Sequence, residues 1–394
     1  MAVEGSEPVR VIYISRLVHR GYAQNRAMTP DPSISLLPIP MPGHHQLADG
    51  ADINILNRYM RIYFPRSYGT LVGNYDMVVM FEAPCGLSGL SRVQFDPKWM
   101  SWMVRGIGED GLSILMMGGD ACWGGGQEGS AFYKSWGETI LDEVLPFESL
   151  VGTNPATAAF NLPSFIDPDH PLNVLPWEEA GPVELLNRVL TRPGATLIAQ
   201  AAGKDGSYPW IAAWRYGQGK AVGETQIHWS KETTNVMFDS WEWYPDFIIY
   251  LMYFGVDKPI PEDILLVHDL RVKMREYRLR IALLVSLLEF VEDFGANMVS
   301  LYGDLGLIQE RQSEAGELYR SDDYQGTAGV FEEVDELMEL LDARALRAKE
   351  GALAWVYVIE WLTVSGVSLA AGTITWMIMV NRGLYREVGT TRLR

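Results

Sequence analysis

Short apolar runs alternate with amphipathic segments along the first part of the chain. Arg10–Ser15, Asp76–Phe81 and Leu112–Met117 have the length and composition of buried strands. Asp96–Ile107 has helical spacing, with Pro97 near its start. Strands that alternate with helices predict an α/β domain, in which a parallel sheet is covered by helices on both faces.

A hairpin is predicted farther along. Thr196–Ala201 and Trp210–Trp214 have the pattern of strands, and Tyr216–Lys220 is a glycine-containing tight turn. Ala221–Ile227 would then return beside the preceding strand. An aromatic-rich helix is expected to follow over Val236–Phe254.

The remaining segments of this domain are assigned from composition. Met28–Gly43 is rich in proline and predicts a long loop, whereas Asp52–Ile62 and Ala131–Val144 have helical patterns. His44 and His45 are adjacent and could bind a metal ion. No Cys, Asp or Glu stands at ligand spacing nearby, which favours a solvated loop.

The character of the chain changes after a linker at Lys258–Pro261. Asp263–Phe294 has helical periodicity, and its apolar part, Ala282–Val291, is too short to span a bilayer and is expected to pack on another helix. Gly316–Asp342 is acidic with an apolar stripe at helical spacing. Together these segments predict a helical hairpin that stands on a membrane.

The next segment has the composition of a membrane-spanning helix. Trp361–Val380 is about twenty residues without a charge, which is enough to cross a bilayer. Trp355, Tyr357 and Trp376 lie near its ends, as interfacial aromatic residues do. Small residues within it offer a surface for another helix. The alternative is a buried helix of a soluble core, which is seldom so long and uncharged.

Glu360 and the charges that flank the helix bear on its orientation in the membrane. Glu360 either snorkels to the bilayer surface or pairs with a charge on a partner subunit. The basic tail after Val380 slightly favours a cytoplasmic C-terminus, but basic residues also flank the other end. Because Met1–Pro8 has no signal-peptide pattern, the main domain is expected to be cytoplasmic.

Composition narrows the class of protein. The chain has 394 residues, a formal charge of -18 and a pI near 4.8, which argues against nucleic acid as a partner. Its 2 cysteines make no disulfide framework and favour a reducing compartment. It contains no dinucleotide fingerprint, phosphate-binding loop or zinc-ligand spacing, so no cofactor and no metal are expected.

The most suggestive stretch for chemistry is Gly111–Gly126, in which a buried strand runs into a glycine-rich turn. Clustered glycines indicate a backbone that turns sharply or approaches something closely. In α/β proteins this junction is where nucleophiles and phosphate sites lie. A glycine-rich turn without chemistry is an equally good interpretation of the stretch alone.

The order of parts over Arg10–Val256 resembles the class I glutamine amidotransferase-like superfamily, and in particular its membrane-associated branch in bacteria and archaea. The matching pieces are LMMGGDACWGGG, SWGETILDEVLP, HPLNVLP and RYGQGKAVGETQIHW, followed by the aromatic helix. The C-terminal phrase MVNRGLYREVGTTRL is also similar to that branch. The resemblance implies a flavodoxin-like sheet.

The resemblance also implies that the catalytic residues are degenerate. The family places its nucleophilic cysteine at the tip of a G-x-C-x-G elbow, but here the tip is Asp120, between Gly118 and Cys122. His228 matches the family histidine, although Trp229 and Ser230 replace the proline and glutamate that follow it.

The loop that supplies the family's oxyanion N–H groups corresponds to Phe81–Gly86. It carries Glu82, whose negative charge would oppose a developing oxyanion. Glutaminase activity is therefore not expected. Two alternatives remain open: Cys122 could act as a shifted nucleophile with His228, or be a small packed residue. Asp120 and His228 could form an acid–base pair or bind a ligand. Candidate binding residues are Gly118, Gly119, Glu82 and Trp229.

These observations predict a catalytically degenerate domain at residues 1–257, a helical arm at 258–352, a transmembrane helix at 353–381 and a basic tail at 382–394. The expected role is a membrane-anchored subunit or scaffold, with integral membrane proteins as partners through the spanning helix and the arm. A hydrolase or amidotransferase, or a sensor of a small ligand in the same cleft, is the alternative.

Overall fold

The structure is a computed structural model, and it describes residues 7–16, 28–41, 61–83, 85–87, 90–118, 122–124, 133–150, 156–157, 163–183, 185–203, 206–227, 237, 240–294 and 298–391. The chain divides into two compact units. The first comprises Met1–Arg275 with Gly316–Tyr324, and the second comprises Glu276–Ala315 with Gln325–Arg394. The predicted linker at Lys258–Pro261 lies inside the first unit.

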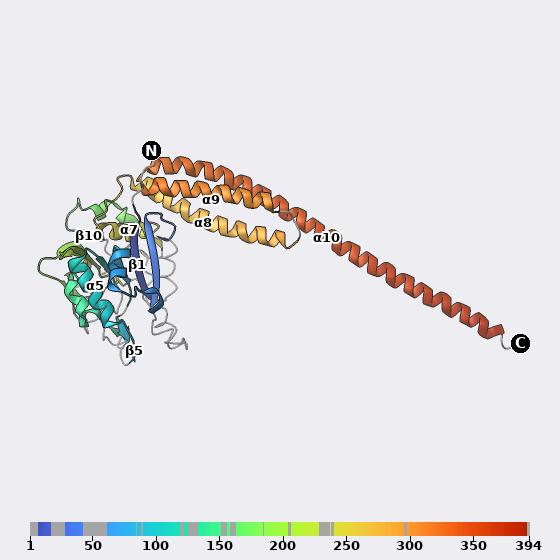
Figure 1. Ribbon diagram of the computed structural model, residues 1–394, viewed down its shortest axis with the longest axis horizontal. Coiled ribbons are helices and arrows are strands. Elements are labelled where there is room, and N and C mark those ends of the chain that lie inside the picture. The colour runs from blue at the N-terminus through green and yellow to red at the C-terminus, as the bar shows by residue number, and fades with distance from the viewer. Residues whose placement is uncertain are drawn as a thin grey trace. The chain divides into compact units, whose positions relative to one another are not determined.

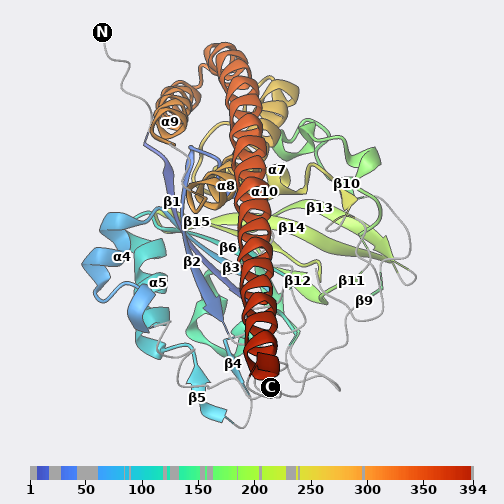
Figure 2. The same cartoon turned by 90° about the vertical axis from the view of Figure 1, so that its right-hand side faces the viewer.

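An eight-stranded mixed sheet forms the centre of the first unit, in the order β10-β13-β14-β15-β6-β3-β1-β2. In Figure 2, β1 and β2 lie toward the left and β13 and β10 toward the right. The strands are β1 Val9–Arg16, β2 Ile34–Met41, β3 Met77–Phe81, β6 Ser113–Met117, β10 Ser164–Phe165, β13 Thr196–Gly203, β14 Gly206–Tyr216 and β15 Gly219–Glu224.

The α/β prediction is confirmed, but the sheet is mixed, because antiparallel strands extend the expected parallel part beyond the predicted hairpin. Strands β2, β1, β3, β6 and β15 are parallel, whereas β10, β13 and β14 pair antiparallel. The connections between β13, β14 and β15 are too short for a parallel crossover, which needs a dozen or more residues. Only Gly217 and Gln218 separate β14 from β15, so these strands form the predicted hairpin.

The loop predicted over Met28–Gly43 is wrong where Ile34–Met41 forms β2. This strand is at the edge of the sheet and pairs with β1 on one side. Pro38 and Pro40 are two residues apart, so their nitrogen atoms lie on the same side of the strand. An edge strand tolerates proline on its unpaired side, which is why the prolines do not prevent pairing.

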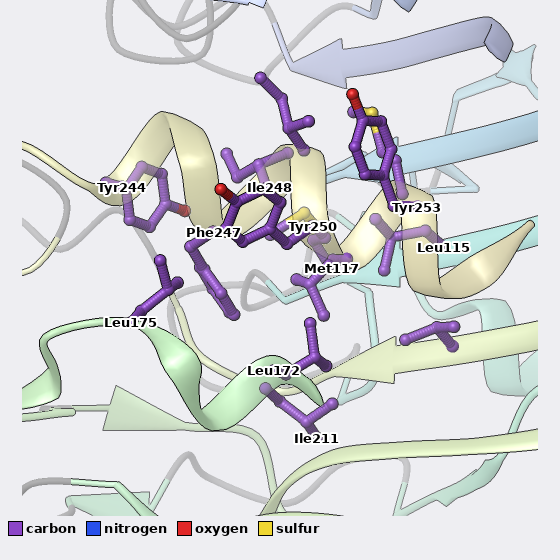
Figure 3. Close-up of a cluster of buried hydrophobic side chains, with 14 of the residues drawn as sticks. Leu115, Met117, Leu172, Leu175, Ile211, Tyr244, Phe247, Ile248, Tyr250 and Tyr253 are labelled. Atoms are coloured by element: carbon purple, nitrogen blue, oxygen red, sulfur yellow. The ribbon is translucent and has the colours of Figure 1, made fainter. Parts of the chain in front are cut away.

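Helices cover both faces of the sheet, as predicted. Alternate strand residues enter two separate cores, because successive side chains of a strand point to opposite faces. Tyr13 and Met117 belong to the core beneath α7 Tyr244–Gly255. Figure 3 shows side chains of α7 lying over residues of β6. The other core lies against α4 and α5, which span Tyr68–Asn74 and Pro97–Glu109.

The helix expected over Ala131–Val144 is wrong. This region forms the short strand β7 Tyr133–Lys134 and two 3-10 turns, η1 Trp136–Glu138 and η2 Ile140–Val144. Ser135 caps the first turn and Thr139 caps the second, each with an extended backbone. Two caps four residues apart divide the segment, because a cap residue cannot also be helical.

Within the helix expected over Val236–Phe254, Met237 and Ser240 are helical, residues 236, 238 and 239 lie outside the described residues, and the continuous helix is α7. Pro245 stands in its first turn, where its missing N–H needs no partner. The described residues of the first unit also form smaller elements: β4 Gly86–Leu87, β5 Leu90–Gln94, β8 Phe147–Ser149, β9 Ala156–Thr157, β11 Leu185–Leu186, β12 Val189–Thr191, η3 Pro171–Val174 and η4 Trp177–Glu179. Most of the predicted Asp52–Ile62 helix lies outside the described residues.

The second unit is built from three helices rather than the predicted hairpin. Helix α8 spans Ile264–Glu292, α9 spans Val299–Arg320 and α10 spans Tyr324–Thr391. Helix α9 was not predicted over residues 299–315, where small and polar residues obscure the apolar stripe. In this unit α8 and α9 lie beside the first part of α10, which continues beyond them (Figure 1).

The second half of α10 is an exposed apolar helix. Among the described residues, Tyr324–Gly383 of α10 is the one helix that is long and apolar enough to cross a membrane. The most apolar stretch has no buried residues. Thr363, Thr373 and Thr375 each donate a hydrogen bond of 2.8 Å to the carbonyl four residues earlier, so these hydroxyls are satisfied within the helix.

Candidate functional site at the carboxyl edge of the sheet

The parallel strands bring four segments to one edge of the sheet. Ser15 pairs with Phe81, Phe81 with Met117 and Met117 with Glu224, so the ends of β1, β3, β6 and β15 are level. Open α/β sheets bind ligands at this carboxyl edge. The edge therefore contains the described part of the predicted site.

Gly118 marks the closest approach of two of these strand ends. A Cβ atom at this position would overlap the backbone carbonyl of Gln226, which follows β15. The Gly118 N–H donates to Oε2 of Glu224 at 3.2 Å. The glycine is therefore required by packing within the sheet edge, whether or not a ligand binds there.

Glu224 is fully buried at this edge. Its Oε1 accepts from the Trp210 indole N–H at 2.6 Å and from the Gln226 N–H at 2.9 Å. Its main-chain carbonyl accepts from the Trp123 indole N–H at 3.0 Å. These bonds tie the strand end to the glycine-rich turn, since Trp123 lies within that turn.

Glu82 has an uncommon backbone conformation for a residue with a side chain. Its φ is 47°, and the residue is 5% exposed. A left-handed conformation of this kind costs about 1–3 kcal/mol and is concentrated at functional sites. Its N–H donates to the Met117 carbonyl at 3.2 Å, which holds the end of β3 against β6.

Two buried tyrosines face these carboxylates. Burial raises the pKa of the Tyr13 hydroxyl well above its ordinary value, and the charge of Glu82 raises it further. Burial also raises the pKa of Tyr244, with contributions from Glu224 and Glu82. Both hydroxyls therefore remain protonated near neutral pH, and they can donate hydrogen bonds but cannot serve as bases.

Cys122 is packed in the core. It is fully buried, and its thiol donates to the Ala83 carbonyl at 3.5 Å. The same carbonyl accepts from the Trp136 indole N–H at 2.6 Å. A reactive cysteine needs partial exposure and a positive environment, so this burial favours the packed-residue interpretation over the shifted nucleophile.

The other predicted residues lie outside the described residues: Asp120, Gly119, His228, Trp229, His44 and His45. Their pairing with Cys122 or with each other stays a prediction. Among the described residues, no three His, Cys, Asp or Glu side chains are gathered to hold a metal ion.

A second buried cluster lies in the first unit, around Arg271 of α8. Its guanidinium donates to Asp31 at 2.7 Å and to Asp246 of α7 at 2.7 Å. It also donates to the Tyr319 hydroxyl of α9 at 2.9 Å. The ring of His268 lies 2.9 Å from Asp246 through Nδ1. All the charges in this cluster are paired, so it fastens the fold rather than forming an open site.

Sequence reasoning missed both Glu224 and the Arg271 cluster. A signal was present, because Glu224 ends the apolar strand Ala221–Glu224 and Asp246 interrupts an aromatic helix. A lone charge in an apolar run is seldom buried without partners. The partners themselves could not be identified, because they come from distant parts of the chain.

A pocket of about 560 Å³ lies at the opposite, amino-terminal edge of the parallel strands. Its lining includes the ion pairs between Arg10 and Asp76 and between Lys220 and Asp257. Because these charged side chains of the lining already pair with each other, they do not indicate which class of ligand the pocket would bind.

Comparison with known proteins identifies no family. No family model matches the chain, and no curated protein matches it. Among solved structures, it is similar to the cytoplasmic proteins STM3548 and STM1381 from Salmonella typhimurium, at 18% and 15% identity. Each similarity has a TM-score of 0.44 and covers 63% of this chain and 99% of the other. The carbohydrate deacetylase Agd3 is similar at 12% identity and a TM-score of 0.33, over 56% of this chain and 29% of Agd3. We base no functional argument on similarities of this size.

Proposed function

We propose that this protein is a membrane-anchored subunit or scaffold of a membrane protein complex and that its α/β domain is not a catalyst. The observation that carries the proposal is the exposed apolar half of α10. Trp361, Leu369 and Trp376 are 75%, 72% and 66% exposed. An apolar surface of this extent requires lipid or partner helices to cover it.

Two observations support a degenerate amidotransferase-like origin for the α/β domain. The parallel strands follow the order β2-β1-β3-β6-β15, which corresponds to the flavodoxin-like order 2-1-3-4-5. Cys122 is buried and Glu82 stands where the resemblance places the oxyanion loop. A buried thiol and a nearby negative charge both disfavour acyl transfer.

We propose a cytoplasmic location for this domain. Cys85 and Cys122 are both buried as thiols, which is the common state of cysteines in a reducing compartment. Proteolysis of sealed membrane vesicles of known orientation tests the location, because a cytoplasmic domain is digested only when the cytoplasmic face is outside.

Extraction of membranes at alkaline pH tests the anchor. The full-length protein is expected to stay in the membrane, and the double variant Leu369→Arg, Ile374→Arg is expected to leave it. Each arginine near the middle of a span costs about 2.5–3.5 kcal/mol on insertion scales. Leu340→Arg with Leu346→Arg is the matched control, because both leucines are exposed on the same helix outside the span. Equal extraction of the two variants would contradict the anchor.

Purification in a mild detergent tests the subunit role. A tagged protein is expected to co-purify with integral membrane proteins in stoichiometric amounts. A solitary protein would contradict this role. Ammonia release from glutamine that is abolished by Cys122→Ser would contradict the non-catalytic part of the proposal.

A further inference from the structure

Four apolar side chains are exposed where α8 ends and α9 begins. Phe290 and Phe294 are 42% and 38% exposed, and Val299 and Tyr302 at the start of α9 are 79% and 38% exposed. The two phenylalanines lie one helical turn apart, with ring centroids separated by 4.9 Å. We refer to these four residues as the α8–α9 tip. All of them belong to the second unit.

Ion pairs place the α9 side of the tip along α10. Arg344 of α10 pairs with Asp304, and Arg311 of α9 lies 3.6 Å from Glu333. The two helices are therefore antiparallel. Val299 precedes Asp304 by five residues, which places it about 7.5 Å closer to the tip at 1.5 Å per residue. The same distance beyond Arg344 leads to about residue 349 of α10.

The α8 side of the tip leads to the same level. Tyr277 donates to Asp335 at 2.7 Å, and the Arg280 Nε lies 2.8 Å from Asp342, so α8 and α10 are parallel. Counting along both helices from these contacts puts Phe294 level with about residues 352–356 of α10. From Ala352 to Val380, α10 carries a single charge, that of Glu360, so its predominantly apolar part begins at Ala352. The α8–α9 tip is therefore level with the point where α10 would enter a membrane.

We propose that the α8–α9 tip is a second membrane contact, which inserts its exposed apolar side chains into the headgroup region beside the entry point of α10. This inference rests on the proposed membrane anchor. Continuity with the apolar surface of α10 favours lipid as the occupant, because both surfaces would meet the same interface. Aromatic side chains are enriched at that depth, and the tip carries three of them.

The charges around the tip predict whether the membrane contact requires anionic lipid. Arg347 and Lys349 lie at this level of α10, but Glu289, Glu292 and Asp293 lie at the end of α8. The net charge is not positive, so attraction to anionic lipid cannot drive the contact. Insertion of apolar side chains is expected to drive it, with equal strength in zwitterionic and anionic bilayers.

Lipid-borne quenchers test the inference in the full-length protein reconstituted into phosphatidylcholine vesicles. An environment-sensitive fluorophore is attached to one introduced cysteine, because the native Cys85 and Cys122 are buried. Val299→Cys reports the tip, and Val367→Cys reports the span. Leu283→Cys reports an exposed position about 10 Å farther from the interface on α8.

The expected result is quenching at Val299→Cys by a quencher near the headgroups, quenching at Val367→Cys by a deeper one, and no quenching at Leu283→Cys. Tyr302→Cys supplies a second reporter if Val299→Cys does not fold. Quenching at Val367→Cys without quenching at the tip would overturn the inference and leave the anchor intact. No quenching at Val367→Cys would instead contradict the anchor.

Two further results would overturn the inference. Shielding of both Val299→Cys and Leu283→Cys from aqueous iodide, without quenching by lipid, would indicate a protein partner or a second copy of the chain. Quenching at the tip that occurs only with anionic lipid would indicate electrostatic adsorption instead of apolar insertion.

Discussion

The first unit buries charge in two ways. In the Arg271 cluster, one cation lies between the carboxylates of Asp31 and Asp246. Glu224 is also buried, but its described hydrogen bonds come from the neutral N–H groups of Trp210, Gly118 and Gln226. Opposite charges stabilise the first cluster, whereas the hydrogen bonds described for Glu224 come from oriented N–H dipoles.

The difference reflects what each cluster holds in place. Arg271 and Asp31 are 240 residues apart in the chain, so their ion pair fixes tertiary structure between distant segments. Glu224 and its donors shape neighbouring strand ends at the carboxyl edge of the sheet. Loss of the Arg271 cluster should therefore loosen the whole unit, and a change near Glu224 should act on the edge.

Arg271→Ala is expected to have the largest effect. Removal of one partner of a buried pair leaves uncompensated charge and costs about 3–5 kcal/mol. Unfolding by urea in detergent, followed by tryptophan fluorescence, measures the loss. Arg105→Ala is the control, because Arg105 forms a solvent-exposed pair with Glu109 on α5, and solvent screening leaves such a pair little influence on stability. Equal losses in the two variants would show that the buried cluster does not fasten the unit.

Gly118→Ala is expected to have a smaller but clear effect at the other cluster. The added Cβ would overlap the Gln226 carbonyl, and relief of such overlap typically costs about 1–3 kcal/mol. Gly69→Ala is the control, since a Cβ there meets nothing within 4 Å in α4. That control should be neutral or slightly stabilising. If Gly118→Ala unfolds at the wild-type urea concentration, the close approach of the two strand ends is not required.

The smallest expected effect is a change in the free energy of unfolding at acid pH, which is expected from the Arg271 cluster. Burial alone would raise the pKa of the Asp246 carboxyl, but Arg271 and His268 bring it below its ordinary value. A carboxyl with a lowered folded-state pKa stabilises the fold above its unfolded pKa of about 4, and this contribution is lost as the pH falls through the folded value.

The difference in stability between wild type and Arg271→Ala should therefore shrink as the pH falls from the pKa of Asp246 in the folded variant, which burial raises, toward its lowered pKa in the folded wild type. Urea midpoints measured over a series of pH values test this. A difference that stays constant would mean that Asp246 does not depend on Arg271 for its charge.

Much of the fold could be predicted because local patterns decide it. The apolar runs of β1, β3 and β6, the β14–β15 hairpin and the capped helix α5 are confirmed. The failures arise where position in the fold overrides composition. Prolines are accepted in β2 because it is an edge strand, and that position cannot be seen in a local window.

The candidate site was harder to predict than the fold. The sequence indicates a special turn at Gly118, and the structure gives the reason as the close approach of Gln226. The sequence does not indicate that Glu224 accepts the hydrogen bond from the Gly118 N–H, or that Asp31 pairs with Arg271. Such pairings depend on tertiary contacts, which residue patterns in one sequence do not encode.

The continuity of α10 has a mechanical consequence. It is one helix of 68 residues, about 100 Å long at 1.5 Å per residue. The same helix contains Phe331, which packs on Tyr277 of α8, and the exposed apolar segment around Trp376. A helix without a break transmits torque along its axis. A twist applied to the apolar segment would therefore reach Phe331 and strain its ring contact with Tyr277 in the same unit.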